Sequence, residues 1–493
     1  MQHRSHLVFV IPAAVFIAAL LTGPGSFDAT DGAEFAVAGS RLETAHPPGY
    51  PLFLMLLRVE SILFSPLYGH LRLINCILGA VTASILRKPL GGSQGSSVSA
   101  ASASVMLLLS APVLSQLNSL EIYPLAMALT AAAIRLRSSR LGGYATGMAV
   151  FGGHPTALFS VPMLLPSKRK VFFFITALIP LSLMLYLPLR APVSRIAHYG
   201  HPGSLQDFLT YFSMYSGKLQ IPSLKRLMTA LSFAGPVTGT VYSLTAAAGG
   251  RFKAGIDIPA LLALVFMASY QLPDPAGQLW ILLLPLTFRA ASGIRNLISL
   301  NKAFKWILPL TAAASALSGI HMADRTEDDI ALRWTTDVFS EIPPGAVYRP
   351  VAHDVFYAAY ASEVLGFRSD VILSDPYGNY FELNIPTPVP CMLGNRPVIL
   401  SRGWNRMPEF KLSGLVFHPA ANRTEPCWNT MSIFKYNGSS PDPMALDLAA
   451  EAWARRILQT DNPALADSFF NRAMGFASTE LTEKRIEEIR NSQ

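Results

Sequence analysis

Apolar runs long enough to cross a lipid bilayer recur through the first two-thirds of the chain. The hydrocarbon core of a membrane takes about 20 residues of α-helix, and the run 7–22 is the first candidate. The later runs are approximately 71–87, 98–116, 121–136, 171–189, 229–249, 257–272, 277–290 and 304–320. The sequence therefore predicts a polytopic α-helical membrane protein, with about nine to eleven spans over residues 1–320.

Two apolar segments, the run 7–22 and the interrupted segment 142–165, have alternative interpretations. The run 7–22 also has the layout of a signal peptide, but further spans follow and no clear Ala-x-Ala cleavage site does, which favours an uncleaved span. The segment 142–165 is interrupted by Gly152-Gly-His-Pro155. A broken backbone within a membrane must be buried in protein or line a cavity, so two short helices or a re-entrant pair are expected here.

Charge is distributed unevenly along the chain. Residues 1–320 hold 23 Lys or Arg but only nine Asp or Glu, whereas the last 173 residues hold 16 and 22. With the N-terminus in the cytoplasm, the short basic loops fall inside, as the positive-inside rule requires. Eight of the nine acids then lie outside, mainly in two long outer loops, 23–70 and 190–228. This one-sidedness predicts a chemical site on the outer face.

The C-terminal region, residues 321–493, is expected to form an extracytoplasmic α/β plus helical domain. Buried strands are predicted at 345–348 and 370–373 with a helix over 355–365 between them, and helices follow at 445–458 and 465–490. Cys391 and Cys427 could form a disulfide outside the cytoplasm, and both states stay open. No Cys/His spacing resembles a zinc site, and no basic run is interleaved with aromatics, so no nucleic-acid partner is predicted.

Three acids in the first outer loop form the leading candidate for chemistry. Asp28, Asp31 and Glu34 are spaced three apart, so on a helix they would share one face. Mutual repulsion could turn one into a general base, or the group could hold a divalent cation. An ordinary solvated loop is the alternative.

Further polar residues stand at the edges of the apolar runs. The segment Ala45-His46-Pro-Pro-Gly-Tyr50-Pro predicts a rigid turn that would hold His46 near the outer surface, either for binding or as a structural strut. Glu121 could face a cavity or be a surface acid, and His154 could face the same cavity or cap a half-helix. Arg190, at the outer mouth of a span, suits a lipid-linked phosphate or a headgroup anchor.

Three segments together resemble one family. They are Asp31-Gly-Ala-Glu34, Ala45-His-Pro-Pro-Gly-Tyr-Pro-Leu52, and Tyr186-Leu-Pro-Leu-Arg190 followed by Tyr199-Gly-His-Pro202. They are similar to motifs of the GT-C type membrane glycosyltransferase family that includes the animal transmembrane (plexin-type) protein O-mannosyltransferase and its bacterial relatives. Glu121-Ile-Tyr and His154 also resemble family positions, and Asp324-Arg-Thr326 and Gly366-Phe-Arg-Ser-Asp-Val371 resemble the family's post-membrane segment. Gly32-Ala33 and Tyr199-Gly-His201 depart from the family pattern.

The resemblance implies a GT-C fold and a polyprenyl-phosphate-sugar donor. It implies Asp31 as the catalytic base and Glu34 as its catalytic neighbour. We expect inverting transfer of a sugar, mannose favoured, to an acceptor hydroxyl on the extracytoplasmic face. A protein Ser or Thr is the favoured acceptor, with a glycan as the alternative. The expected substrate-binding residues are His46, Tyr50, Glu121, His154 and Arg190, the last stabilising the leaving phosphate. No cofactor is assigned, with a divalent cation left open, and the favoured location is a bacterial inner membrane, or the endoplasmic reticulum in a eukaryote.

Two other functions compete with this hypothesis. A transporter also has broken helices and polar groups within the membrane, although the polar residues here gather at one face and no inverted repeat is evident. A non-catalytic membrane scaffold that presents the C-terminal region is the second alternative.

Overall fold

The computed structural model describes most of the chain. The described ranges are 7–91, 97–166, 170–194, 202–213, 220–270, 275–351, 353–375, 381, 383, 385, 389–401, 409–420, 428, 430–436, 438, 442–478 and 480–491. Two expectations lie outside them: the segment around Tyr199 in the family motif, and the partner cysteine Cys427.

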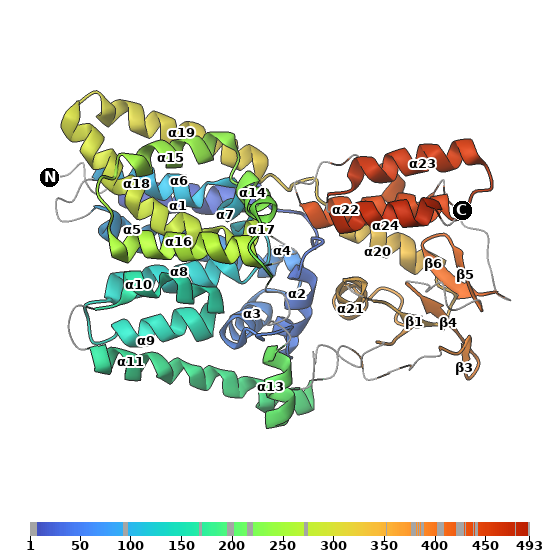
Figure 1. Ribbon diagram of the computed structural model, residues 1–493. Helices are drawn as coiled ribbons and strands as arrows, with labels where there is room; N and C mark the ends of the chain where they lie inside the picture. Colours follow the sequence, from blue (N-terminus) through green and yellow to red (C-terminus); the bar gives the residue numbers. More distant parts are fainter. Residues whose placement is uncertain are drawn as a thin grey trace.

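Apolar helices from the first two-thirds of the chain pack lengthwise into a bundle (Figure 1). Their buried side chains form one continuous core rich in Leu and Ala. The bundle helices are α1 (Leu7–Leu21), α5 (Leu73–Gly91), α6 (Ser97–Leu108), α7 (Ala111–Leu117), α8 (Tyr123–Leu136), α14 (Leu224–Ser232), α15 (Pro236–Ala247), α16 (Ala254–Ser269), α17 (Pro275–Gln278), α18 (Trp280–Leu300) and α19 (Phe304–Met322). Most coincide with the predicted apolar runs, because burial of apolar side chains drives both the pattern and the packing.

Within the described residues, three helical segments are long and apolar enough to cross a membrane. They are Tyr68–Gly91, Lys170–Val193 and Trp280–Leu300, and a fourth arises if α6 and α7, bent by 70°, count as one span. Shorter apolar helices of 10–17 residues, α8 and α16 among them, accompany these. The count of nine to eleven spans stays a prediction.

The segment 142–165 is broken where the sequence predicted. It runs through α9 (Gly142–Gly147), the π-helix η2 (Met148–Gly153), the 3₁₀-helix η3 (Pro155–Ser160) and α10 (Val161–Leu164). The break falls at His154, whose backbone is extended (φ −133°, ψ 140°). Proline lacks an N–H and restricts the residue before it to extended backbone, so Pro155 ends the preceding helix.

The expected single helix over 229–249 is wrong. Its residues are divided between α14 and α15 by Gly235, which has φ +72°, a conformation that L side chains rarely adopt. Pro236 then starts α15. The predicted span 171–189, which precedes this segment in the chain, is one continuous apolar helical segment. It consists of α11 (Lys170–Leu178), η4 (Ile179–Leu185), α12 (Tyr186–Arg190) and η5 (Ala191–Val193).

The first predicted outer loop is folded into short helices at one end of the bundle. They are α2 (Gly32–Arg41), α3 (Pro51–Leu63) and α4 (Tyr68–Leu71). The second loop contains α13 (Leu205–Ser213), as the amphipathic pattern there suggested. Buried side chains of α2 and α3 share one hydrophobic core with the C-terminal region, so this loop joins the bundle to that region (Figure 1).

The C-terminal region has the predicted α/β plus helical character. Its elements are α20 (Ile330–Glu341), β1 (Val347–Arg349), α21 (Asp354–Glu363), β2 (Ile372–Leu373), β3 (Met392–Leu393), β4 (Arg396–Leu400), β5 (Phe410–Ser413), β6 (Val416–Pro419), η8 (Ser432–Lys435), α22 (Pro443–Ile457), α23 (Pro463–Phe476) and α24 (Glu480–Asn491). The sheet order is β2-β1-β4-β6-β5, with β3 on β4. β1 pairs in parallel with β2 and β4, and the other pairs are antiparallel.

Two details of this region differ from expectation. The strand predicted at 370–373 is not buried: β2 lies at the edge of the sheet, and Ile372 is 38% exposed. The helical pattern over 465–490 belongs to two helices, α23 and α24. Both misassignments arise because local sequence pattern does not show where an element sits in the fold.

Candidate active site

The histidine-containing turn between α2 and α3 has the rigid form that its prolines and glycine predicted. The Gly49 amide donates a hydrogen bond to the His46 carbonyl at 2.8 Å. Gly49 has φ +88°, and a Cβ there would lie 2.4 Å from Leu187 and 2.8 Å from the Tyr211 hydroxyl. That hydroxyl donates to the Ala45 carbonyl at 2.6 Å. The turn is therefore clamped from the side of α12 and α13, which fixes where His46 points.

His46 and Glu34 form a tightly bonded pair. One Glu34 carboxylate oxygen accepts the His46 backbone N–H at 2.8 Å, and the other lies 2.5 Å from His46 Nδ1. The Glu34 side chain is fully buried. Because a buried carboxylate needs donors for both oxygens, Glu34 is best satisfied when His46 carries its proton on Nδ1. The remaining ring nitrogen, Nε2, is then directed at the next group of the site.

That next group is Asp31, whose carboxylate faces two histidines. Its oxygens lie 3.6 Å from His46 Nε2 and 3.9 Å from His353 Nε2. Both distances exceed a direct hydrogen bond, and no hydrogen bond to the Asp31 side chain is found among the described residues. The side chain is 36% exposed. Asp31 is thus the accessible carboxylate of the site, whereas Glu34 is the buried one.

The expectation that three acids share one helix face is wrong. The helix α2 begins only at Gly32, and Asp31 is its N-cap residue. Asp28 precedes the helix and points elsewhere: its carboxylate accepts from the Tyr68 hydroxyl at 2.6 Å and from the Thr30 hydroxyl at 2.7 Å. Asp31 and Glu34 therefore belong to the site, and Asp28 belongs to the structure beneath it.

Asp28 is one of three buried carboxylates around a buried arginine. Arg325 lies 3.5 Å from Asp28 and 3.1 Å from Asp328, and it also bonds Asp442. Burial of Arg325 acts to lower its pKa, but the combined Coulombic attraction to these acids outweighs burial and holds the pKa well above its ordinary value. The cluster ties the first loop to the start of the C-terminal region and to α22, and it keeps the α2 N-terminus in place.

Tyr50 and His154 extend the site into the bundle. The Tyr50 hydroxyl lies 3.4 Å from His46 Nε2, and the Tyr50 ring stacks on the His154 ring at 5.8 Å. His154 is buried, and its Nδ1 accepts the Thr156 backbone N–H at 3.2 Å. The cap interpretation of His154 is therefore confirmed, and the same ring supports Tyr50.

Glu121 lies in a different place from the Asp31 cluster. It is buried, and it lines a cavity of about 250 Å³ beside Ser119, Arg325 and Asp442. Its backbone carbonyl accepts a hydrogen bond from Asn75 at 2.8 Å. The structure thus bears out the expectation of an acid facing a cavity, and a role in substrate binding stays a prediction.

Arg190 is attached to the end of α2. Its Nε donates to the Leu42 carbonyl at 2.6 Å, and a terminal nitrogen lies 3.4 Å from the Arg41 carbonyl. Leu42 is the C-cap of α2. The negative end of the helix dipole lies there and stabilises a positive charge such as that of Arg190. The arginine thus links the 170–193 segment to the C-terminal end of α2; its binding of phosphate stays a prediction.

The cluster could also hold a metal. Asp31, Glu34 and His46 each offer one ligand atom, and these atoms all lie within 4.8 Å of one another. Carboxylate and imidazole ligands bind zinc at about 2.0–2.2 Å, so ligand atoms on one ion are typically more than 3 Å apart. Glu34 and His46 Nδ1 lie closer than that and bond each other, so His46 would offer its other ring nitrogen, Nε2, which lies 3.6 Å from Asp31.

Comparison with known proteins places these residues in a family context. Residues 31–164 match the family model described as the protein O-mannosyl-transferase TMEM260 N-terminal domain. The resemblance seen in the motifs is confirmed. The protein O-mannosyl-transferase TMEM260 of Mus musculus is 31% identical over 238 residues, which cover 42% of this chain and 33% of the mouse protein. This chain therefore matches about a third of the length of its mouse relative.

Solved structures show a similar architecture. The structure of ArnT from Cupriavidus metallidurans bound to undecaprenyl phosphate matches with a TM-score of 0.50 and 11% identity, over 75% of this chain and 85% of that chain. The apo state of ArnT matches with a TM-score of 0.49 and 12% identity, over 76% and 86%. The first likeness shows the fold, which is helix-rich and GT-C-like.

The sequence did not point to His353 of this site, or to Asp442 of the Arg325 cluster beneath it. His353 comes from the C-terminal region and starts α21, yet it lies beside Asp31. Asp442, at the N-cap of α22, completes the shell of acids around Arg325. Neither stands in a motif, so no local signal identified them. For Arg325, the segment Asp324-Arg-Thr326 resembled the family and offered a hint.

Proposed function

We propose that this protein is a multi-pass membrane GT-C glycosyltransferase that moves a sugar, mannose favoured, from a polyprenyl-phosphate donor to an acceptor hydroxyl outside the cytoplasm. The observation that carries the proposal is the convergence of Asp31, Glu34 and His46 at one end of an apolar bundle, within the segment that matches the family model. The name of the mouse relative supports mannose, and the ligand of ArnT supports the lipid phosphate. A bacterial inner membrane is favoured.

Asp31 acts as the general base in this proposal. It is the accessible carboxylate, and its oxygens are engaged by no short hydrogen bond among the described residues. Asp31 takes the proton of the acceptor hydroxyl as that oxygen attacks the anomeric carbon. The bond between this carbon and the phosphate oxygen breaks, polyprenyl phosphate leaves with the electron pair, and the anomeric centre inverts.

Glu34, His46 and Arg190 support this step. Glu34 holds the His46 ring so that its Nε2 stands 3.6 Å from the base. Arg190 would stabilise charge on the leaving phosphate, since guanidinium binds phosphate well. Tyr50 and His154 beside His46, and Glu121 in its own cavity of about 250 Å³, would bind the substrates. A divalent cation held by the Asp31 cluster stays an alternative way to neutralise the phosphate, and loss of activity on chelation with EDTA, restored by added metal, would favour it.

The test is sugar transfer by the purified protein from labelled polyprenyl-phosphate mannose to Ser/Thr peptides. Asp31→Asn is compared with Asp329→Asn, a matched control. Asp329 is likewise an N-cap residue without a side-chain capping hydrogen bond, and its side chain is 40% exposed against 36% for Asp31. We expect Asp31→Asn to lose at least about 100-fold in rate, because general bases contribute about 10²–10⁴-fold, and Asp329→Asn to stay near wild type.

Equal transfer by Asp31→Asn and wild type would refute the assignment of the base. Absence of product from the wild type with mannose and with other polyprenyl-phosphate sugars would refute the proposed activity. Solute uptake into proteoliposomes would then favour the transporter alternative.

A further inference from the structure

A second cavity lies at the end of the bundle away from the acidic site. Its volume is about 640 Å³, within the range of about 300–1,000 Å³ typical of small-molecule pockets. It is lined by the C-terminal ends of α5 and α8, by α10, by the start of α16 and by the later turns of α18. These elements are distant in sequence, so the hollow is formed by the fold of the bundle.

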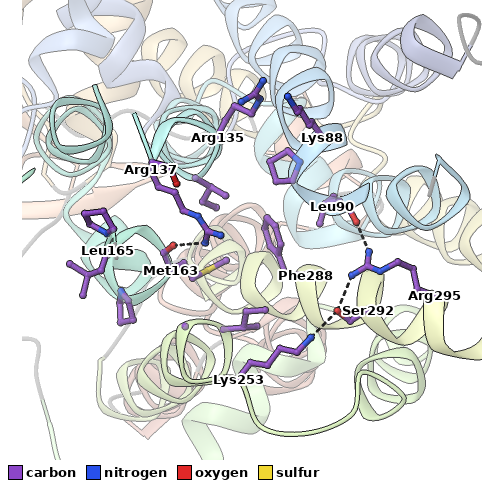
Figure 2. Close-up of a pocket in the computed structure, with 17 residues that line it drawn as sticks. Lys88, Leu90, Arg135, Arg137, Met163, Leu165, Lys253, Phe288, Ser292 and Arg295 are labelled. Atoms are coloured by element: carbon purple, nitrogen blue, oxygen red, sulfur yellow. Dashed lines mark hydrogen bonds between the residues drawn. The ribbon is translucent and has the colours of Figure 1, made fainter. Parts of the chain in front are cut away.

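The lining of this cavity is strongly basic. Five cationic side chains contribute to it: Lys88, Arg135, Arg137, Lys253 and Arg295. Figure 2 shows Lys88 and Arg135 above the cavity in that view, with the other three arranged around it. Among the described residues that line it, none is acidic. We call this cavity the basic pocket.

Several of the cations are fixed in position by uncharged oxygens. Arg295 donates to the Leu90 carbonyl at 2.6 Å and to the Ser292 hydroxyl at 3.0 Å, and the Lys253 ammonium lies 3.3 Å from that hydroxyl. Arg137 donates to the Met163 carbonyl at 3.2 Å. These bonds orient the cations without neutralising them, so their charge remains available to an anion.

Asp257, an acidic residue in the first turn of α16, is engaged by groups outside the pocket lining or by backbone. Asp257 accepts the Lys253 backbone N–H at 2.5 Å, and it pairs with Arg289 at 3.0 Å. Neither Asp257 nor Arg289 lines the basic pocket. Like charges gathered in one hollow repel one another unless an anion joins them, so the pocket favours an anionic ligand.

The position of the pocket favours a phosphate group carried by a lipid. The helix α5 runs from the side of the acidic site to the pocket, and its 19 residues span roughly 27 Å at a rise of about 1.5 Å per residue. This is close to the roughly 30 Å thickness of a bilayer core. If one end of the bundle lies at the outer surface, the basic pocket lies at the depth of the opposite headgroups, where anionic lipids attract basic residues.

We infer that the basic pocket is a binding site for a phosphate group, supplied by the headgroup of an anionic phospholipid or by a soluble phosphate compound. Arg135, Arg137 and Arg295 supply the guanidinium groups, which bind phosphate oxygens in pairs, and Lys88 and Lys253 supply point charges. Apolar side chains such as Phe288 and Met163 line the same cavity and suit the glycerol and acyl part of a lipid. The inference does not depend on the reaction at Asp31.

The test measures binding of dioctanoyl-phosphatidylglycerol to the purified full-length protein in detergent, with dioctanoyl-phosphatidylcholine as the zwitterionic lipid and inorganic pyrophosphate as the soluble phosphate. The test variant is Lys88→Gln with Arg135→Gln. The matched control is Arg87→Gln with Arg140→Gln, which removes the same charge from neighbouring positions that do not line the pocket. Thermal unfolding midpoints check that both variants fold.

We expect the wild type to prefer phosphatidylglycerol over phosphatidylcholine. A surface cation contributes about five-fold to such binding, so the test variant should bind about 25-fold more weakly. The control should lose less than about three-fold, because exposed charges outside the pocket are screened by water and salt. Pyrophosphate that binds with the same dependence on Lys88 and Arg135, without a preference for the lipid, would identify a soluble phosphate as the ligand. Equal losses of affinity in both variants would overturn the inference, because binding would then depend on the overall positive charge of that end of the bundle and not on the pocket. Absence of binding by all the probes would overturn it as well.

Discussion

Replacing Glu34 by glutamine should damage catalysis through His46, without removing any group that touches the substrate. The amide has nearly the shape of the carboxylate, so the buried site keeps its packing. In the wild type, His46 Nδ1 lies 2.5 Å from a Glu34 carboxylate oxygen. In the variant, the glutamine NH₂ group can hydrogen-bond Nδ1 only if Nδ1 accepts the hydrogen bond and therefore carries no proton. The ring proton then moves to Nε2, which faces Asp31 at 3.6 Å. A ring N–H directed at the proposed base stabilises its ionised form and weakens it.

The size of this effect follows from the hydrogen bonds that change. A bond to a charged group contributes about 1.5–3 kcal/mol, and a neutral bond about 0.5–1.5 kcal/mol. The difference, about 1–2 kcal/mol, corresponds to a rate loss of about 5- to 30-fold. Because the substrate does not contact Glu34 in this arrangement, we expect the loss in kcat and little change in KM.

The assay is mannose transfer by Glu34→Gln, His46→Gln and the double variant. A double-mutant cycle isolates the pairwise term, which we expect at about 1–2 kcal/mol. Glu60→Gln is the control, since Glu60 is another buried glutamate of the same loop and lies on α3. Additive losses in the cycle, or an activity of Glu34→Gln within about two-fold of wild type, would refute the positioning role.

Three further predictions concern stability, measured by SDS titration or thermal unfolding in detergent. Arg325→Met leaves three buried carboxylates without their cation and should lower the free energy of unfolding by about 3–5 kcal/mol. Arg333→Met removes a half-exposed ion pair and should lower it by about 0–1 kcal/mol. Equal losses in the two variants would contradict a stabilising role of the Arg325 cluster. Burial raises the pKa of Glu60 from 4.5 to about 8. The unfolded chain therefore loses this proton first, and wild-type stability should fall as pH rises from about 5 to 8, with a smaller fall in Glu60→Gln; parallel curves would contradict this. Gly49→Ala meets crowding at φ +88° and should cost about 1–3 kcal/mol, whereas Gly25→Ala, with open space around it, should change stability by about 0.5 kcal/mol or less.

The sequence predicted best those features that depend on local physics. Apolar runs located the bundle helices, because the same side chains that make a run hydrophobic become buried. The break at His154 followed from the adjacent Pro155, which cannot continue a helix on its N-terminal side. The His46 turn followed from its prolines and glycine. In each case the determining residues are neighbours in the chain.

The orientation of the acids required knowledge of where α2 begins. A spacing of three places residues on one face only within a helix, and Asp28 lies before the helix starts. Its carboxylate is drawn toward Tyr68 and Arg325, which approach from distant parts of the chain. Such partners cannot be identified from the spacing, which suggested one group of three acids, whereas the fold places Asp28 beside Arg325 and places Asp31 and Glu34 beside His46.

The contact between Asp31 and His353 changes how the scaffold alternative should be tested. The C-terminal region holds the first outer loop through the Tyr357 hydroxyl, which donates to the Ala29 carbonyl at 2.7 Å, and through the Tyr360 hydroxyl, which accepts the Tyr68 amide at 2.7 Å. Deletion of residues 321–493 would therefore remove His353, a neighbour of the proposed base, and at the same time remove the hydrogen bonds that hold the first outer loop in place. Loss of function after such a deletion would fit a scaffold and an enzyme equally well. Point changes at Asp31 and Glu34 separate the two, because a scaffold would tolerate them and the proposed reaction would not.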